Sequence, residues 1–285
     1  MGIVVIGAVF VDIKGYPLST YIPGGRNAGR IEQVHGGVSR NVAEDIANVE
    51  LRPTFVGLVD DTGMGQDVID KLDNHKVNTR YIQKVPDGMG TWLAIFDNDG
   101  DVHAAISKRP DTTPLTTLLE NMLELSRLVS SEEPLPLAET DLGLLCAERL
   151  QIQRELSQNP SVEYVLKGGG RGTCVIPTNE TYMTRVIDNL LQNAAKFTAA
   201  GSVTVCCDKD DRTRKLRIRV TDTGIGIAPD KQEWVFDRFT KVDSFKPGSG
   251  IGLYLCRLIV TRLGGAIRVC PDYRAGCCIE ITLPY

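Results

Sequence analysis

The chain has 285 residues, which is room for two ordinary domains. Its 42% hydrophobic and 24% charged residues are typical of a folded soluble protein, and no apolar run reaches the length of a membrane span. The formal net charge of −4 argues against a general nucleic-acid-binding surface.

The first predicted element is an apolar strand. Residues 2–11 are almost all apolar and lead to Asp12, which the pattern places at the tip of the strand, where ligands of open α/β sheets bind. The start has no basic leader and no cleavage site, so it predicts a buried strand and not a signal peptide. We therefore expect a cytoplasmic protein with reduced thiols.

Alternating strands and helices are predicted next. Gly36 and Gly37 open a helix that contains Asn41, and a strand at 54–59 leads to a second helix that reaches Asp73. Two short strands are predicted next, at 91–97 and 102–107. Residues 98–100, Asn-Asp-Gly, lie between them and are a strong hairpin signal.

This first part, residues 1–111, resembles the N-terminal third of a PfkB/ribokinase-family sugar kinase. The resemblance rests on Asp12, Gly37, Asn41 and the segment 56–63. It implies that Asp12, Gly37 and Asn41 contact sugar hydroxyls, a task that suits the directional hydrogen bonds of carboxylates and amides.

One part of that family's pattern has no counterpart in the chain. The catalytic Gly-Ala-Gly-Asp segment, which carries the base and the anion hole, is not found in the sequence. Phosphoryl transfer needs a positioned base and charge stabilisation around the phosphoryl group. We therefore expect residues 1–111 to be a structural or dimerising remnant, in which Asp12 and Asn41 retain at most weak polyol binding.

A helix is predicted at 115–128. Pro114 suits its first position, and Thr112 or Thr113 could cap it. Its apolar residues form one helical stripe, which suits a core face or a dimer seam, at positions 115, 118, 119, 122, 125 and 128. A linker at 130–140 and further predicted elements follow, at 142–156, 174–176 and 180–196.

The helix predicted at 180–196 carries a polar stripe. Asn189, Asn193 and Lys196 are spaced by four and three residues, so they share one face. Such a stripe is either a solvated surface or, beside glycine-rich turns, one side of a nucleotide site.

Two glycine clusters follow this helix. A strand at 216–221 leads to Asp222 and to the first cluster at 222–227, where one carboxylate could accept a hydrogen bond from the exocyclic amine of a base. The second cluster at 248–253 runs into an amphipathic helix, and backbone N–H groups before a helix favour phosphate. Either cluster alone would predict an ordinary turn.

Residues from about 115 to 285 resemble the C-terminal part of a sensor histidine kinase, with its GHKL-type (Bergerat) ATP-binding domain. The resemblance lies in four motifs, in family order and at family spacing: an asparagine box at 189–198, a first glycine box at 222–227, a phenylalanine box at 235–239 and a second glycine box at 248–253.

This resemblance implies a site for ATP and Mg²⁺. Asn193 would hold Mg²⁺ through its side-chain oxygen, Asn189 and Lys196 would face the phosphates, and Asp222 would take the adenine amine. Gly224 and Gly226 would shape the base pocket, and Phe236 and Phe239 would fasten a lid. The triphosphate would be wrapped by Gly248, Gly250 and Gly252.

The phosphoacceptor of such kinases has no counterpart. The chain has three histidines, His35, His75 and His103, and none lies beyond residue 103. The resemblance therefore implies transfer to a histidine supplied by another chain. It also implies a homodimer and a response-regulator partner.

The sequence thus predicts an α/β (α+β) protein in which a truncated ribokinase-like piece joins a two-layer α/β sandwich. The predicted parts are 1–111, a dimerisation-type helix at 112–130, and an ATP-binding domain at 131–285. Alternatives to a histidine-kinase module are a non-enzymatic nucleotide-binding scaffold and a carbohydrate kinase. A hydrolytic GHKL ATPase is disfavoured, since such relatives use a glutamate in the asparagine-box helix and the residue before Asn193 is Gln192.

Overall fold

The computed structural model describes residues 2–131, 133–240 and 250–285. The described chain divides into two compact units within helix α3 (Thr113–Ser130), between Glu120 and Asn121. Each unit has its own hydrophobic core. The predicted mixed α/β fold class is confirmed.

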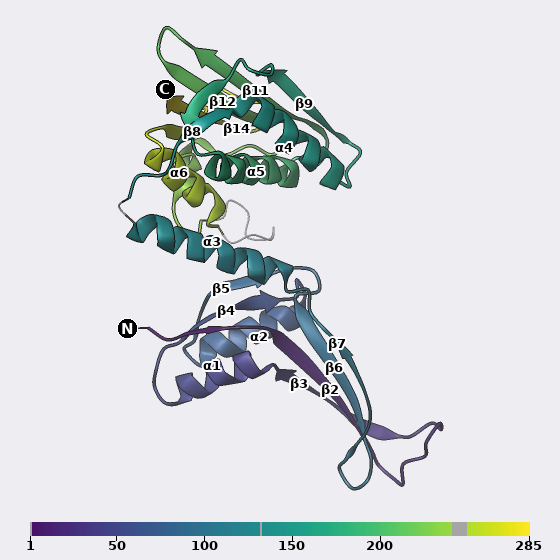
Figure 1. The fold of residues 1–285 in the computed structure, drawn as a ribbon. Helices are drawn as coiled ribbons and strands as arrows, with labels where there is room; N and C mark the ends of the chain where they lie inside the picture. Colours follow the sequence, from purple (N-terminus) through teal and green to yellow (C-terminus); the bar gives the residue numbers. More distant parts are fainter. Residues whose placement is uncertain (1, 132, 241–249) are drawn as a thin grey trace. The chain divides into compact units, whose positions relative to one another are not determined.

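The first unit contains a parallel three-stranded sheet. Its strand order is β1 (Val4–Ile6), β4 (Thr54–Val59) and β5 (Asn78–Lys84), and both pairings are parallel. Helices α1 (Val38–Asn48) and α2 (Gly63–Asn74) connect these strands and lie against the sheet, as Figure 1 shows. The apolar run of β4 is buried except at its first residue.

A four-stranded sheet completes the first unit. Its order is β3 (Gly29–Gly36), β2 (Val9–Pro17), β6 (Met89–Phe96) and β7 (Val102–Lys108). The predicted hairpin is present, because β6 and β7 pair antiparallel and Gly100 between them adopts a φ of 86°.

The single N-terminal strand that the apolar run predicted is instead two strands in different sheets. Close packing at Gly7 explains the break: its N–H donates to the carbonyl of Val56 at 3.1 Å, and a Cβ there would lie 1.9 Å from Oγ of Ser39. Asp12 therefore lies within β2, with Val34 and Trp92 as its neighbours on β3 and β6, and not at a strand tip.

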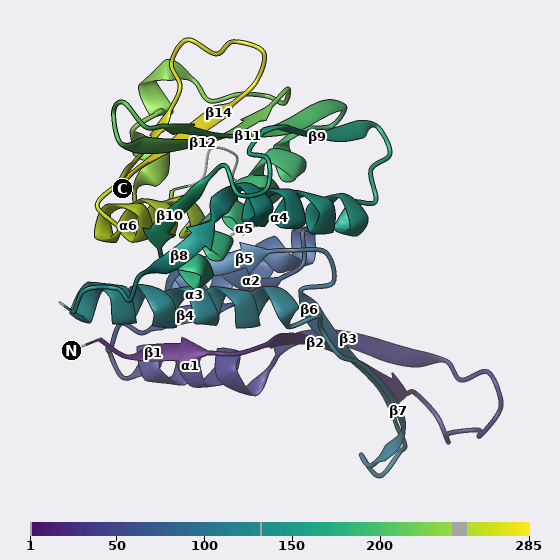
Figure 2. The ribbon, with the colours of Figure 1, turned by 45° about the horizontal axis from the view of Figure 1, so that its top comes forward.

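The second unit is a two-layer sandwich. A five-stranded sheet in the order β13-β14-β12-β11-β9 forms one layer, and α4, α5 and α6 form the other (Figures 1 and 2). The element bounds are α4 Leu142–Leu156, β9 Val162–Gly168, α5 Glu180–Phe197, β11 Gly201–Asp210, β12 Lys215–Asp222, α6 Gly252–Arg262, β13 Ala266–Val269 and β14 Cys278–Pro284.

Helix α5 is central to the helical layer, since it packs against both α4 and α6. It begins at a favourable cap, because the side chain of Asn179 accepts a hydrogen bond from the N–H of Tyr182 at 3.0 Å, and Glu180 lies in its first turn. Its apolar face is fully buried, at Met183, Val186, Ile187, Leu190, Leu191 and Ala194. The polar stripe of Asn189, Asn193 and Lys196 lies beside this buried face and is partly buried.

Two strands of the second unit were not predicted. β8 (Ala138–Asp141) lies in the predicted linker and pairs with β10 (Val175–Thr178). β9 forms the edge of the five-stranded sheet and pairs parallel with β11. Two short 3₁₀ helices, at Pro229–Lys231 and Trp234–Phe236, follow β12.

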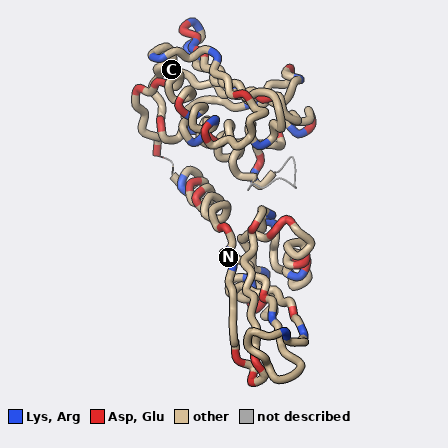
Figure 3. Tube along the Cα trace, turned by 90° about the vertical axis from the view of Figure 1, so that its right-hand side faces the viewer, with Lys and Arg blue, Asp and Glu red and all other residues tan. Residues whose placement is uncertain are grey.

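Acidic and basic residues are interspersed along the chain in both units, as the colours in Figure 3 show. Among the described helices, none has both the length and the apolar character that crossing a bilayer would require.

Candidate nucleotide-binding site

The polar face of α5 contacts the start of α6. Asn189, Asn193 and Lys196 are partly buried on this face. The amide nitrogen of Asn189 donates to the carbonyl of Arg185 at 3.1 Å, and its Oδ1 lies only 2.9 Å from where a Cβ on Gly252 would be. Gly252 therefore lets the first turn of α6 approach α5 closely. Nζ of Lys196 lies 4.9 Å from the centre of the Phe197 ring.

Asp222 is the buried carboxylate of the site. It is the last residue of β12 and is 6% exposed. Its Oδ1 accepts hydrogen bonds from the N–H groups of Gly224 at 2.8 Å and Cys277 at 3.2 Å, so both backbone bonds go to one oxygen. Burial raises the pKa of Asp222 above its usual value, and the two backbone bonds oppose that rise.

The first glycine turn rests on the C-terminal end of α5. A Cβ on Gly224 would lie 2.2 Å from the carbonyl oxygen of Phe197, which leaves no room for a side chain. The N–H of Ile225 approaches the same oxygen at 3.4 Å. Helix α5 therefore contacts the first glycine turn at its end and the second glycine cluster near its middle.

The same turn also packs against the connection between β13 and β14. Gly226 has a φ of 70°, and a Cβ on it would lie 2.9 Å from the carbonyl oxygen of Gly276. A Cβ on Gly276 would lie 2.2 Å from the carbonyl oxygen of Asp222. Glycine is thus required on both sides of this contact.

The phenylalanine box is divided between core and turn. Phe236 is 2% exposed and belongs to the hydrophobic core, with the guanidinium of Arg257 5.8 Å from its ring centre. Phe239 has a φ of 62°, and its N–H donates to the carbonyl of Gly250 at 2.9 Å. Gly250 itself has a φ of 68°. Gly248, predicted to wrap the triphosphate, lies outside the described residues.

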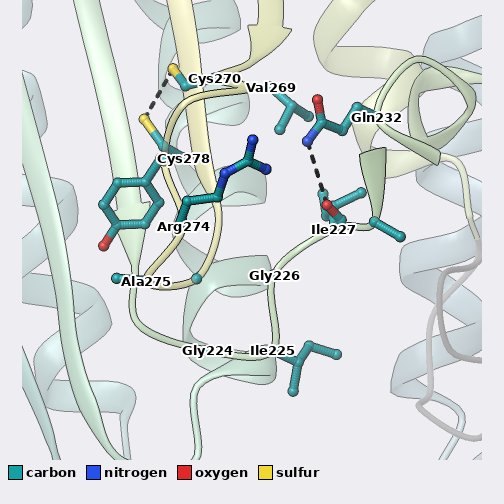
Figure 4. Close-up of a pocket in the computed structure, with 13 residues that line it drawn as sticks. Gly224, Ile225, Gly226, Ile227, Gln232, Val269, Cys270, Arg274, Ala275 and Cys278 are labelled. Atoms are coloured by element: carbon teal, nitrogen blue, oxygen red, sulfur yellow. Dashed lines mark hydrogen bonds between the residues drawn. The ribbon is translucent and has the colours of Figure 1, made fainter. Parts of the chain in front are cut away.

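A cavity of about 360 Å³ opens between the first glycine turn and the β13–β14 connection (Figure 4). Gly224 and Gly226 line it, whereas Asn189, Asn193 and Lys196 do not. The wall formed by the β13–β14 connection was not predicted from the sequence. Its residues are Cys270, Tyr273, Arg274, Ala275, Gly276 and Cys278, and no motif marks them.

Magnesium would need the nucleotide to complete its coordination. The described residues contain no group of three or more His, Cys, Asp or Glu side chains that could hold a metal by themselves. Asn193 offers an amide oxygen on the polar face of α5, and Mg²⁺ is commonly held by few protein ligands together with phosphates and water. The donor set fits a metal that arrives with a nucleotide.

The predicted sugar-binding residues lie together in the first unit. The carboxylate of Asp12 lies 2.8 Å from where a Cβ on Gly36 would be, and Gly37 caps α1 with a φ of 102°. Oδ1 of Asn41 accepts a hydrogen bond from the buried Arg40 at 2.7 Å. Asn41 is therefore already engaged by a neighbouring side chain.

Comparison with known protein families places the chain in two classes. Residues 2–166 match the pfkB family of carbohydrate kinases, and residues 178–285 match the family described as histidine kinase-, DNA gyrase B- and HSP90-like ATPase. Since the first match covers more than half of its length, the chain belongs to the pfkB family, and it carries the ATPase domain at its C-terminal end. Both predicted resemblances are confirmed, although the pfkB match extends past the predicted junction and includes β8, α4 and most of β9.

Two curated relatives match one part each. The guanosine-inosine kinase of Exiguobacterium acetylicum is 40% identical over 110 residues, which are 38% of this chain and 36% of that protein. The sensor protein SrrB of Staphylococcus aureus (strain NCTC 8325 / PS 47) is 39% identical over 107 residues, which are 36% of this chain and 18% of SrrB. The chain thus spans about a third and about a fifth of these two relatives.

Solved histidine kinases share the fold of the second unit. Full-length ShkA in complex with AMPPNP superposes with a TM-score of 0.54 at 26% identity, over 60% of this chain and 35% of ShkA. Histidine kinase ThkA in complex with the response regulator TrrA gives a TM-score of 0.50 at 22% identity, over 61% of this chain and 48% of that one, which supports the fold alone. The C-terminal part is therefore an ATP-binding module of the sensor-histidine-kinase type.

Proposed function

We propose that the chain binds ATP with Mg²⁺ on the polar face of α5 and transfers the γ-phosphoryl group to a histidine of another chain. The observation that carries this proposal is the position of α5. Its middle meets Gly252 at the start of α6, and its end meets Gly224 in the first glycine turn. A nucleotide on this face would have a carboxylate at one end and a helix N-terminus at the other.

Each motif residue has a role in this proposal. Asp222 fixes the base, because its Oδ2 is not used by the two backbone bonds and can accept a hydrogen bond from the adenine amine. Asn189 and Lys196 face the phosphates, and Asn193 supplies an oxygen to Mg²⁺, which offsets phosphate charge when bound. The remaining roles are structural. Gly224 and Gly226 shape the base pocket, and Gly250 and Gly252 approach the phosphates. Phe236 and Phe239 fasten the lid.

The phosphoacceptor must come from elsewhere, because the histidines of this chain have other surroundings. His35 is packed beside the buried Arg40, and burial lowers its pKa. His75 contacts Asn48 and Glu44 at 3.3 Å, and the ring of His103 packs at a tilt against that of Tyr21, with 4.4 Å between ring centres. All three belong to the first unit and lie outside the ATPase match.

Nucleotide binding tests the first half of the proposal. Calorimetry with AMPPNP and Mg²⁺ should give one site per chain, and Asn193→Ala should weaken binding at least tenfold in the presence of Mg²⁺. Gln192→Ala is the matched control, because Gln192 is the exposed neighbour on the same helix. No binding by the intact chain, or equal binding by both variants, would contradict the site.

Transfer tests the second half. The chain would be incubated with γ-labelled ATP and a separate helical bundle that carries a histidine phosphoacceptor. Acid-labile label on the bundle supports a kinase. If nucleotide binds and no label appears, the chain is a non-enzymatic nucleotide-binding scaffold. This is the second candidate function, and it is favoured because the three histidines of the chain lie outside the ATPase match.

A homodimer is also proposed, with one restriction from α3. Leu128, the last residue of the predicted seam, is 3% exposed and packs into the core of the second unit. That position is already covered within one chain, so a dimer would use other residues. Sedimentation of the purified chain at micromolar concentration would show whether it dimerises. A response-regulator partner is proposed as well. It would receive the phosphoryl group from the histidine-bearing bundle, so it can be tested once transfer to that bundle has been observed.

A further inference from the structure

Two cysteines face each other where β13 and β14 begin to separate. The register that pairs Val269 with Ile279 places Cys270 opposite Cys278. The N–H of Cys270 donates to the carbonyl of Cys278 at 2.8 Å, and the two sulfur atoms are 3.1 Å apart (Figure 4). Opposed residues of an antiparallel pair share a face, and their spacing falls within the range that a disulfide bridges.

A small molecule can reach this pair. Both Cys270 and Cys278 line the cavity of about 360 Å³, and Cys270 is partly exposed while Cys278 is buried. The buried thiols Cys146, Cys174 and Cys207 do not line that cavity, although they also belong to the second unit. Access and proximity therefore coincide at Cys270 and Cys278.

We propose that Cys270 and Cys278 form a modification site, a dithiol that a low-molecular-weight disulfide oxidises to a Cys270–Cys278 cross-link. The thiolate of Cys270 attacks one sulfur of the small disulfide, forms a mixed disulfide and releases one thiolate. The thiolate of Cys278 then attacks the sulfur of Cys270 and releases the second. The protein loses two electrons and two protons, and the small disulfide leaves as two thiols.

The cross-link would tie together the two ends of the β13–β14 connection, which forms one wall of the cavity. It would join Cys270, the first residue of the β13–β14 connection, to Cys278, the first residue of β14. Burial raises the pKa of the Cys270 thiol to about 12, so little thiolate is present at neutral pH and the exchange will be slow. The reaction is therefore followed over hours at pH 8.

The test uses the full chain and oxidised glutathione. After incubation, acid quenching and alkylation, cleavage at Arg268 and Arg274 separates a peptide with Cys270 from one with Cys277 and Cys278. We expect these two peptides to be joined, with fragmentation placing the bond at Cys278. The thiol titre of the denatured chain should fall from eight to six.

Variants make the assignment specific. Cys270→Ser and Cys278→Ser should abolish the joined peptides, whereas Cys277→Ser should retain them. Cys270→Ser is the decisive variant, because its partly exposed position tolerates serine better than the buried Cys278 does, and circular dichroism checks that it is folded. A bond from Cys270 to Cys277, a stable mixed disulfide at Cys270, or no joined peptide would overturn the proposal.

Discussion

At the scale of single residues, Asp222 shows a conflict between stability and binding. Its carboxylate is buried, and among the described residues its hydrogen-bond partners are two backbone N–H groups, both on Oδ1. Burial of a charge costs free energy unless it is compensated. The residue is therefore retained at a cost to stability, which is common where a group serves a ligand.

Asp222→Asn should weaken nucleotide binding without weakening the fold. The asparagine Oδ1 can still accept both backbone hydrogen bonds, but an NH₂ group replaces the oxygen that would accept from adenine. Loss of a hydrogen bond to a charged group should reduce AMPPNP affinity by about tenfold or more. Thermal unfolding without nucleotide should show equal or greater stability, and a clear loss of stability would contradict the prediction.

The stability difference between Asp222→Asn and the wild-type chain should depend on pH. The pKa of Asp222 is raised in the folded state, so the folded chain holds this proton more tightly than the unfolded chain does. Wild-type stability is therefore lost as pH rises from 3.8, the unfolded value, through the folded pKa. The stability advantage of Asp222→Asn should grow over that range and then level off. Asp272→Asn, at an exposed position in the β13–β14 connection, is the matched control.

Gly224→Ala should disrupt the first glycine turn. The added Cβ would lie 2.2 Å from the carbonyl oxygen of Phe197, a backbone atom that cannot move without shifting the end of α5. We expect a loss of about 1–3 kcal/mol in unfolding free energy together with loss of nucleotide binding. Gly170→Ala is the control, because its Cβ would meet only ordinary contacts from 3.6 Å, and it should leave both quantities unchanged. Equal effects of the two substitutions would contradict the packing argument.

The sequence predicted the motif residues of the site better than it predicted the cavity wall. Gly224 and Gly226 belong to a short motif with fixed spacing, so the sequence marks them, although the contacts that require glycine there come from Phe197 and Gly276. Arg274 and Tyr273 reach the cavity because β14 pairs with β12, and that pairing joins residues from Thr221 and Cys278, 57 apart, to Lys215 and Pro284, 69 apart. No local pattern encodes such a contact, and the wall therefore appears only in the folded chain.

At the scale of elements, Arg262 holds the end of α3 to α6. Its guanidinium donates to the carbonyls of Leu128 at 2.7 Å and Ser131 at 2.6 Å, and also to that of Glu133. One carbonyl in the last turn of α3 and two just beyond the helix are thus satisfied by one side chain of α6.

Arg262→Ala should release this segment. We expect faster amide hydrogen exchange at residues 121–131 and a loss of about 1–3 kcal/mol in unfolding free energy. Arg219→Ala removes an exposed arginine, paired with Asp208 at 3.0 Å, from the second unit and should leave exchange at 121–131 unchanged. Unaltered exchange in Arg262→Ala would show that other contacts hold the segment.

Long elements with a clear periodicity were predicted from the sequence, and short ones without it were not. The helices α3, α4 and α5 were predicted to within about two residues, because each has a continuous apolar stripe. β8 was missed because its four residues, Ala-Glu-Thr-Asp, have no strand-like alternation and are stabilised by pairing with β10. The N-terminal run was predicted as one strand because its apolar character does not reveal the change of sheet at Gly7.

At the scale of the whole molecule, the pfkB part should not act as a carbohydrate kinase. Its sequence has no Gly-Ala-Gly-Asp segment, the part that would carry the base and the anion hole. The purified chain should therefore transfer no label from γ-labelled ATP to guanosine or inosine, while it still binds AMPPNP. A labelled nucleoside monophosphate would contradict this prediction and restore the carbohydrate-kinase alternative.

The edge strand β9 has a practical consequence for anyone who expresses the ATPase module alone. β9 and α4 lie outside the ATPase match, yet β9 pairs with β11 and Leu142, Cys146, Leu150 and Tyr164 belong to the core of the second unit. A fragment that starts at residue 178 would expose the unpaired edge of β11 beside uncovered apolar side chains, which is a template for aggregation. A fragment that starts at residue 121 keeps both elements and should stay in solution where the shorter one precipitates.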